Sequence, residues 1–143
     1  MLPKLFGRIA ISATVHAELT HRSTPAVVRG WMAQGAPWLE VRPNPDHGGA
    51  VPASLDAGER TTIELADVID ADLIVMDDRD GVAFARAREF AVTGTLGVLD
   101  LAAQRGLIDL FEAFTRLKAT TFHYRQGLLD ALLTQHADRK KEV

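Results

Sequence analysis

The sequence predicts an α/β fold: a doubly wound, mostly parallel sheet with helices on both faces. Two observations predict this class. Short apolar segments alternate with segments of helical periodicity along most of the 143 residues, which is the pattern of strands joined by crossover helices. The run from Asp72 to Asp77 is also apolar between its terminal acids, as expected for a strand covered on both faces. The length fits a single domain over residues 1–143.

Composition limits the chemistry that the chain can perform. Hydrophobic residues make up 47% of it, enough for one buried core. Cysteine is absent, which excludes disulfides, thiolate metal sites and cysteine nucleophiles. A net charge of −3 gives no overall attraction to nucleic acid, so RNA binding would depend on local arginines. We expect a cytoplasmic protein, because no apolar run of about 18 residues and no signal peptide is found.

The first half of the chain is expected to form two strands and two helices before a long loop. In order, these are a strand over 8–12, a helix through 15–19, a helix that begins after Thr24 and a strand over 38–41. Thr24 is a suitable N-cap and Pro25 suits the first helical turn. The apolar stripe of this second helix would be Val27, Val28, Trp31 and Met32. Residues 43–54, rich in proline and glycine, are predicted to be one surface loop.

The second half alternates helices and strands and ends in two amphipathic helices. We expect helices over 55–69, 82–89 and 95–105, strands over 72–77 and 90–93, and final helices over 108–118 and 122–136. Gly106 should stop the third of these helices. The inward residues of the last two would be Phe111, Phe114 and Leu117, then Leu128, Leu129, Leu132 and Leu133. Residues 119–143 are therefore expected to be a C-terminal helix with a solvated basic tail, Arg139 to Lys141.

Three acids are expected at one edge of the sheet. Asp77 ends a strand, Glu59 lies in the first turn of the preceding helix, and Glu18 lies about one turn into the helix after the first strand. In parallel sheets these positions face the crevice at the carboxyl edge, where ligands bind. Carboxylates that converge there repel one another unless a cation neutralises them, and hard oxygen ligands suit Mg²⁺ or Mn²⁺. Phosphodiester hydrolysis is the reaction that this arrangement fits best.

Each of these features also has a structural interpretation. Asp56 and Glu59 have the spacing of a capping box, and Asp77, Asp78 and Asp80 could form an ordinary polar turn. Glu18 could be a solvated helix residue, and the segment from Thr93 to Gly97 could simply cap a helix or could bind phosphate. We expect the histidines to be surface or structural, since none has metal-ligand spacing: His16, His21, His47, His123 and His136. No Gly-x-Ser-x-Gly elbow supports a nucleophilic serine.

Five segments, in their order and spacing, resemble the uncharacterised branch of PIN-domain proteins related to VapC toxins. They are Leu2–Gly7, Val15–Leu19, Leu55–Arg60, Ile74–Asp78 and Val92–Leu99, and the similarity extends to about residue 118. The resemblance implies an Mg²⁺- or Mn²⁺-dependent RNase. Its catalytic and metal-binding acids would be Glu18, Glu59 and Asp77, with Asp78 as a further ligand. Substrate contacts are expected from Thr93, Thr95, Arg60 and Arg79.

The sequence departs from the resembled pattern at its start. Members of that branch begin with a central strand that ends in an aspartate-containing turn, and no such strand precedes Leu2 here. Either the native protein starts earlier or this is a degenerate form. Without that strand, its two neighbours would expose unpaired backbone, so we expect a homodimer or a monomer of low stability.

Three functions remain open at this level. The first is an endoribonuclease, the toxin of a toxin-antitoxin pair, whose partners would be RNA and an antitoxin protein. The second is a non-catalytic PIN-like module that binds RNA or a protein partner through the same cleft. The third is a nucleotide-binding domain that uses Thr93 to Gly97, but no Gly-x-Gly-x-x-Gly or Walker sequence supports it.

Overall fold

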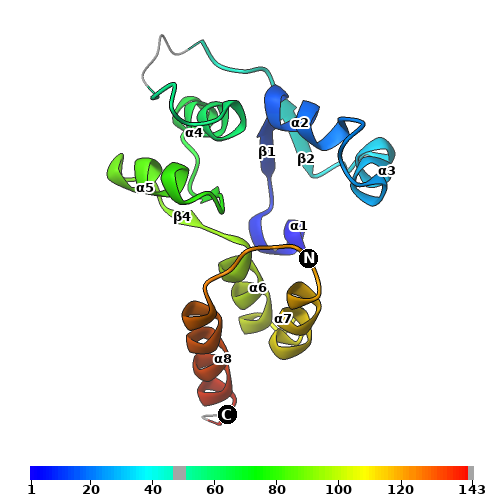
Figure 1. Cartoon of the computed structure of the whole chain (residues 1–143), viewed down its shortest axis with the longest axis vertical. Coiled ribbons are helices and arrows are strands. Elements are labelled where there is room, and N and C mark those ends of the chain that lie inside the picture. Colours follow the sequence, from blue (N-terminus) through cyan, green and yellow to red (C-terminus); the bar gives the residue numbers. More distant parts are fainter. Residues whose placement is uncertain (47–50, 142–143) are drawn as a thin grey trace. The chain divides into compact units, whose positions relative to one another are not determined.

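The computed structural model describes residues 1–46 and 51–141, which belong to two compact units. The first unit spans 2–92, and the second spans 93–143 together with Met1. The first contains α1 (Leu2–Phe6), β1 (Ile9–Ser12), α2 (Ala13–Thr20), α3 (Ala26–Gln34), β2 (Leu39–Arg42), α4 (Ala57–Ile69), β3 (Ile74–Val75) and α5 (Arg79–Ala87), and β4 (Val92–Thr93) begins at its end (Figure 1). The second contains α6 (Thr95–Gln104), α7 (Leu110–Lys118) and α8 (Gln126–Lys141). Within the described ranges, no helix is both long and apolar enough to cross a bilayer.

The strands form two short sheets. β1 and β2 are parallel, with Ile9 opposite Leu39 and Ser12 opposite Arg42. β3 and β4 form a second two-stranded sheet. The predicted alternation of strands and helices is confirmed, but the described strands do not join into one continuous sheet. The expectation that the strand ending at Asp77 is covered on both faces is wrong, because Val75 is 50% exposed.

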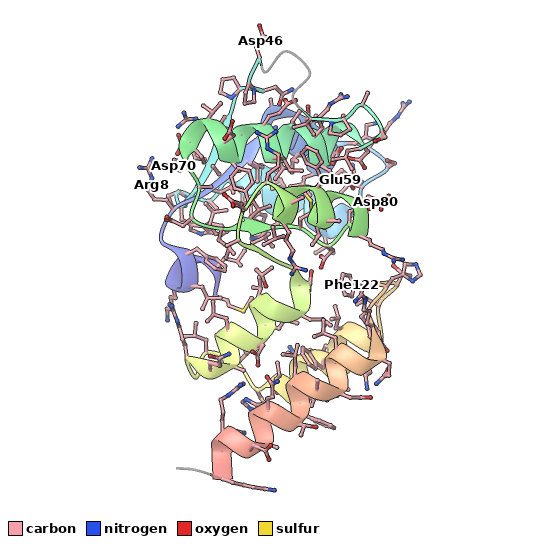
Figure 2. The ribbon with its side chains drawn as sticks, turned by 90° about the vertical axis from the view of Figure 1, so that its left-hand side faces the viewer. Arg8, Asp46, Glu59, Asp70, Asp80 and Phe122 are labelled. Carbon is pink, nitrogen blue, oxygen red and sulfur yellow. The ribbon has the colours of Figure 1, made fainter. Side chains whose placement is uncertain are left out.

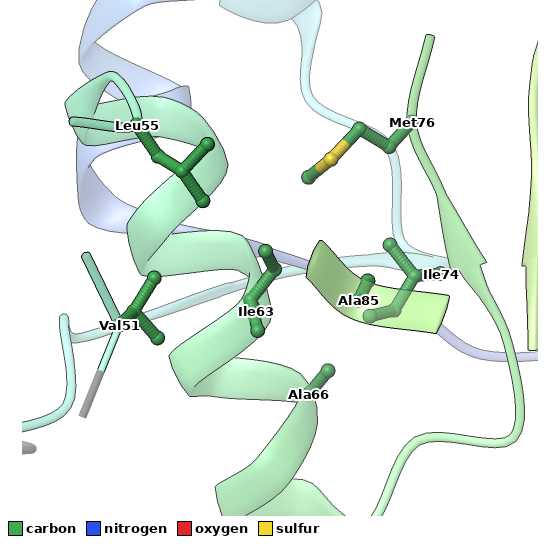
Figure 3. Close-up of a cluster of buried hydrophobic side chains, with 7 residues drawn as sticks. All are labelled: Val51, Leu55, Ile63, Ala66, Ile74, Met76 and Ala85. Atoms are coloured by element: carbon green, nitrogen blue, oxygen red, sulfur yellow. The ribbon is translucent and has the colours of Figure 1, made fainter. Parts of the chain in front are cut away.

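Helix α4 organises the first unit. It contacts α2, β1, β3 and α5, and the capping box predicted for Asp56 and Glu59 fixes its first turn. Its buried face contributes Ile63 and Ala66 to the hydrophobic core (Figure 3). The other buried members of this core are Val51, Leu55, Ile74, Met76 and Ala85. The helix ends at Asp70, which adopts a left-handed conformation with φ of 52°.

Helix α3 differs from the expectation. It begins one residue later than predicted, with Pro25 rather than Thr24 at the N-cap. The hydroxyl of Thr24 instead donates to the carbonyl oxygen of Glu18 at the end of α2. The predicted apolar stripe is not buried, since Val27 is 85% exposed and Trp31 is 45% exposed. Trp31 packs against Trp38, with ring centroids 5.7 Å apart.

The second unit is a helical cluster in which α6, α7 and α8 contact one another. Its buried core consists of Leu96, Ala103, Leu110, Phe114 and Leu129. Gly106, at φ 71°, follows the end of α6 as predicted. The expectation that Phe111 and Leu128 point inward is wrong, because both side chains are exposed.

The basic residues at the C-terminal end are helical and only partly solvated as expected, because Lys140 and Lys141 are exposed but Arg139 is half-buried. Arg139 to Lys141 form the last turn of α8, which starts later and runs further than expected. Arg139 donates to Asp100 Oδ1 at 2.8 Å, while Gln104 donates to Asp100 Oδ2 at 2.8 Å. The buried carboxylate of Asp100 thus holds the last turn of α8, residues 139–141, which contains no apolar residue.

Candidate functional site

Two buried hydroxyls connect the start of α2 to α4. Ser12 caps α2, accepting from the backbone N–H of Val15 at 3.1 Å. Its oxygen lies 2.9 Å from Oγ1 of Thr61. Thr61 in turn donates to the carbonyl oxygen of Ala57 at 2.7 Å, so Ser12 is the donor to Thr61. This chain of hydrogen bonds sets the position of α2, which carries Glu18, relative to the first turn of α4, which carries Glu59.

Glu18 lies directly against the backbone of α4. A Cβ atom at Gly58 would be only 2.8 Å from both Oε1 and Oε2 of Glu18. Gly58 is buried, and it precedes Glu59 in the chain. The absence of a side chain at residue 58 is therefore what lets the Glu18 carboxylate approach the N-terminus of α4.

The Glu59 carboxyl group caps α4, although its surroundings disfavour its charged form. Its Oε2 accepts from the backbone N–H of Asp56 at 3.2 Å, which completes the capping box. Burial raises the pKa of the Glu59 carboxyl, and the charges of Asp56 and Asp78 raise it further, while the hydrogen bond from the Asp56 backbone lowers it. Glu59 is therefore a half-buried acid, and within the described residues the charges that shift its pKa are those of two other acids, Asp56 and Asp78.

Asp78 approaches Glu59 from α5. It is the N-cap of α5, accepting from the backbone N–H of Gly81 at 2.8 Å. A Cβ atom at Gly81 would lie 3.4 Å from Cγ of Glu59 and 3.5 Å from Oδ2 of Asp78. The two acidic side chains thus meet around Gly81, in the first turn of α5. Glu59 and Asp80, in the first turns of α4 and α5, are labelled in Figure 2.

Asp77 is exposed and follows β3 by two residues. Across residues 1–46 and 51–141, no three histidine, aspartate or glutamate side chains are placed together so as to hold a metal ion. The carboxylates of Glu59 and Asp78 each bond to a backbone N–H of their own helix, which turns those oxygens toward the caps. The structure shows two separate approaches: Glu18 lies against Gly58 at the start of α4, and Glu59 and Asp78 meet around Gly81. Glu18, Glu59 and Asp78 are called the row of acids below. A metal cluster that includes Asp77 stays a prediction.

The expected substrate contacts lie on several elements. Arg60 is half-buried in α4, and Arg79 is the exposed first residue of α5. Thr93 and Thr95 belong to the second unit. Oγ1 of Thr93 occupies the space where a Cβ of Gly97 would be, only 2.0 Å away. Contact of these four residues with RNA stays a prediction, and His47 lies outside the described residues.

Sequence reasoning missed four residues that shape this site. Ser12 could have been found, since serine between a strand and a helix is a common N-cap. Gly58 and Gly81 each sit in a first helical turn, where glycine has no helix-forming advantage and suggests a close approach. Thr61 gives no local signal, because its partner Ser12 is 49 residues away.

Comparison with known proteins adds the family. A family model described as DUF3368, a PIN domain, matches residues 1–138. The match covers nearly the whole chain, so the chain belongs to this PIN-domain family, and its fold is an α/β fold of the PIN type. No match was found among curated proteins or solved structures.

Proposed function

We propose that this chain is a metal-dependent endoribonuclease that hydrolyses RNA at the row of acids beside α4. The observation that carries the proposal is that Glu18 lies against Gly58, the residue before Glu59, while Asp78 meets Glu59 around Gly81. Membership of the PIN-domain family supports nuclease chemistry at this place. Asp77, next to Asp78 in the chain, is the further acid of the proposed site.

The donor set suits Mg²⁺ or Mn²⁺. All the acids supply hard carboxylate oxygens. A dication would offset the like charges of Asp56 and Asp78, which help to raise the pKa of Glu59. Oε1 of Glu59 makes no hydrogen bond within the described residues, whereas Oε2 serves the helix cap. We propose that Glu18, Glu59, Asp77 and Asp78 hold the ion. When bound, it would lower the pKa of a coordinated water and offset the charge that develops on the phosphate.

The chain's own residues would prepare the reaction. The Ser12–Thr61 hydrogen bond holds the first turn of α4 against the helix that carries Glu18. The capping box fixes Glu59 at the helix start, where backbone N–H groups point outward and favour negative charge. Arg60 and Arg79, close to these acids in sequence, are proposed to bind the RNA phosphates.

Cleavage of labelled single-stranded RNA with Mn²⁺ or Mg²⁺ tests the proposal. We expect cleavage that EDTA stops and that Glu18→Gln or Glu59→Gln lowers about 100-fold or more. Glu112→Gln is the matched control, because Glu112 is exposed in α7 and pairs only with Arg116 among the described residues. Equal cleavage by all variants would indicate a contaminant. A second readout is thermal unfolding, in which Mn²⁺ should raise the melting temperature of the wild type but not of Glu59→Gln.

The alternative is a non-catalytic PIN-like module that binds RNA or a protein through the same surface. The observation that favours it is the lack, within the described residues, of three acids placed to hold one ion. RNA binding without cleavage, unchanged by Mn²⁺ and by Glu59→Gln, would support this module. It would contradict the nuclease.

The open edges of the two short sheets lead to the proposed partners, a second copy of the chain or an antitoxin protein. In the part of the chain that the structure describes, β1 pairs only with β2 and β3 pairs only with β4. Each therefore has an edge open to another strand, which supports a homodimer or an antitoxin that adds a strand. Light scattering after size-exclusion chromatography should give twice the monomer mass. A stable monomer over a wide concentration range would contradict the dimer.

A further inference from the structure

Helix α3 is apolar on most of its sides, yet it is poorly covered. Its residues are apolar except for Arg29, Gly30 and Gln34. Against the part of the chain that the structure describes, none of its nine residues is buried. A helix of such composition is normally enclosed by its neighbours, and apolar surface gathered in one place marks an interaction site. The surface of α3 is therefore available to a partner.

The exposed side of this helix is arranged around Gly30. Val27, Gly30, Trp31 and Gln34 recur at helical spacing, and all four are exposed. Val27 is 85% exposed and Trp31 is 45% exposed. A Cβ atom at Gly30 would meet nothing within 4 Å, so this position is open space beside the two large apolar side chains. We call these four residues the α3 face.

Contacts with the rest of the first unit hold the α3 face in place. The ring of Trp31 packs against that of Trp38, with centroids 5.7 Å apart and planes tilted by 48°. Trp38 is half-buried and directly precedes β2. Just before the helix, the Thr24 hydroxyl donates to the carbonyl oxygen of Glu18 in α2. A surface positioned in advance binds a partner at a lower entropic cost.

The segment that contains α3 is positively charged. Residues 19–39 include Arg22 and Arg29, both exposed, and no acidic residue. Glu40, which follows the segment, is paired with two arginines that lie outside it. The whole chain, in contrast, has a net charge of −3. An acidic partner would be attracted to this segment in particular.

The charge and the apolar side chains together decide which partner fits. A second copy would bring the same arginines, and no acids, to a symmetric contact, so the charges would repel. A nucleic acid strand would match the charge, but its phosphates would place polar groups against the aliphatic side chain of Val27. An amphipathic helix with one apolar side and acidic flanks satisfies both requirements.

We propose that the α3 face binds an acidic amphipathic helix of another protein. The apolar residues of that helix cover Val27 and Trp31. Its acids face Arg22 and Arg29. This surface consists of helix side chains rather than strand backbone, so it differs from the open sheet edges, and the proposal does not depend on the nuclease function. Because α3 contacts α2, beside which it lies in Figure 1, the partner binds next to the helix that carries Glu18.

The two tryptophans of the chain report directly on this binding. Trp31 belongs to the α3 face, and Trp38 packs against it. The probe is a synthetic peptide of about 20 residues without tryptophan, with leucines at helical spacing and glutamates between them. Titrated into the full chain, it should shift the tryptophan emission to shorter wavelength, because Trp31 leaves water. A scrambled peptide, and one with lysines in place of the glutamates, should bind at least about tenfold more weakly.

Val27→Asp tests the contact itself. The new charge lies in the apolar surface and repels the glutamates, so peptide binding should weaken about tenfold or more. Val68→Asp is the matched control, because Val68 is a valine of α4 in the same unit and is 54% exposed. It should leave binding unchanged. Both variants should fold, since both valines are exposed, and circular dichroism verifies this.

A second pair of changes tests the role of charge. Arg22→Gln combined with Arg29→Gln should weaken binding of the acidic peptide about two- to fivefold and make it less sensitive to salt. Unchanged affinity and unchanged salt dependence would contradict the acidic character of the partner.

Other outcomes overturn the proposal and identify what replaces it. No binding of the acidic peptide, or binding that Val27→Asp does not weaken, means that the α3 face is not its site. An emission shift caused by single-stranded RNA instead of the peptide, and lost in Val27→Asp, would make a nucleic acid the occupant. A concentration-dependent dimer that Val27→Asp abolishes and Val68→Asp keeps would make a second copy the occupant.

Discussion

The hydroxyl oxygens of Ser12 and Thr61 lie 2.9 Å apart in the interior of the first unit, and this bond joins the two helices that carry Glu18 and Glu59. Ser12 is completely buried, and it also caps α2. A single serine therefore contributes to the stability of the fold and to the position of the proposed catalytic acids.

The first prediction concerns this serine. Ser12→Ala removes both a helix cap and a buried hydrogen bond, so the free energy of unfolding should fall by about 1–3 kcal/mol. Urea denaturation measures it, with Ser54→Ala, an exposed loop serine, as the control. RNA cleavage should fall as well under conditions where the variant is folded. A change in unfolding free energy below about 0.5 kcal/mol would show that the bond has little weight.

The second prediction separates stability from activity at Gly58. In Gly58→Ala the new methyl group would lie 2.8 Å from the Glu18 carboxylate, which is the end of a flexible, exposed side chain and can move away. The fold should keep its stability or gain up to about 1 kcal/mol, because alanine favours helix. Cleavage should fall at least about tenfold, since Glu18 leaves its place against the first turn of α4.

Gly30→Ala provides the comparison for Gly58. Gly30 is also helical, in α3, and a Cβ there meets nothing within 4 Å. That variant should gain similar stability and keep full activity. Full activity in Gly58→Ala would mean that the position of Glu18 does not matter for the reaction.

The third prediction is a pH dependence that originates at Glu59. Burial, with the charges of Asp56 and Asp78, raises its pKa above the ordinary value of 4.5. The folded state thus holds this proton more tightly than the unfolded state does. Its stabilising effect is fully present below the ordinary pKa and is lost as pH rises through the folded pKa.

Glu59→Gln tests this dependence, because glutamine keeps the cap acceptor but cannot ionise. Relative to the wild type, the variant should be more stable near pH 7, and the difference should shrink toward pH 4 or below. Chemical denaturation across this pH range gives the comparison. A variant that is less stable at neutral pH, by the same amount at every pH, would show that the carboxylate contributes only as a cap.

The sequence predicted those parts of the structure that depend on local patterns. The alternation of strands and helices, the capping box at Asp56 and the end of α6 near Gly106 follow from residues close together in the chain. Pairing of distant residues has no such signature. The division into two short sheets depends on which strands meet, and the bond between Ser12 and Thr61 joins residues 49 positions apart.

The proposed site shows the same limit. Glu18 and Glu59 were predicted from their places after a strand and at a helix start, but the glycines that they lie against, Gly58 and Gly81, were not. A missing side chain is informative only when its neighbour in space is known. His21 was expected to be surface or structural, and it is indeed exposed; the bonds from Ser23 that orient it became visible only in three dimensions.

The fourth prediction concerns Arg139, which the sequence suggested to be part of a solvated tail. Its guanidinium bonds to Asp100, a carboxylate only 8% exposed, and so fixes the last turn of α8 to α6. Arg139→Ala would leave that buried charge with Gln104 as its remaining side-chain partner among the described residues. We expect the free energy of unfolding to fall by about 1–2 kcal/mol, at the low end for a charged hydrogen bond because Arg139 is partly in water.

Hydrogen exchange of the α8 amides measures this loss and should accelerate in Arg139→Ala. Lys141→Ala, a change at an exposed residue of the same turn, should alter the exchange little. Equal protection of α8 in both variants would mean that the apolar contact of Leu129 with the core holds the helix without this ion pair.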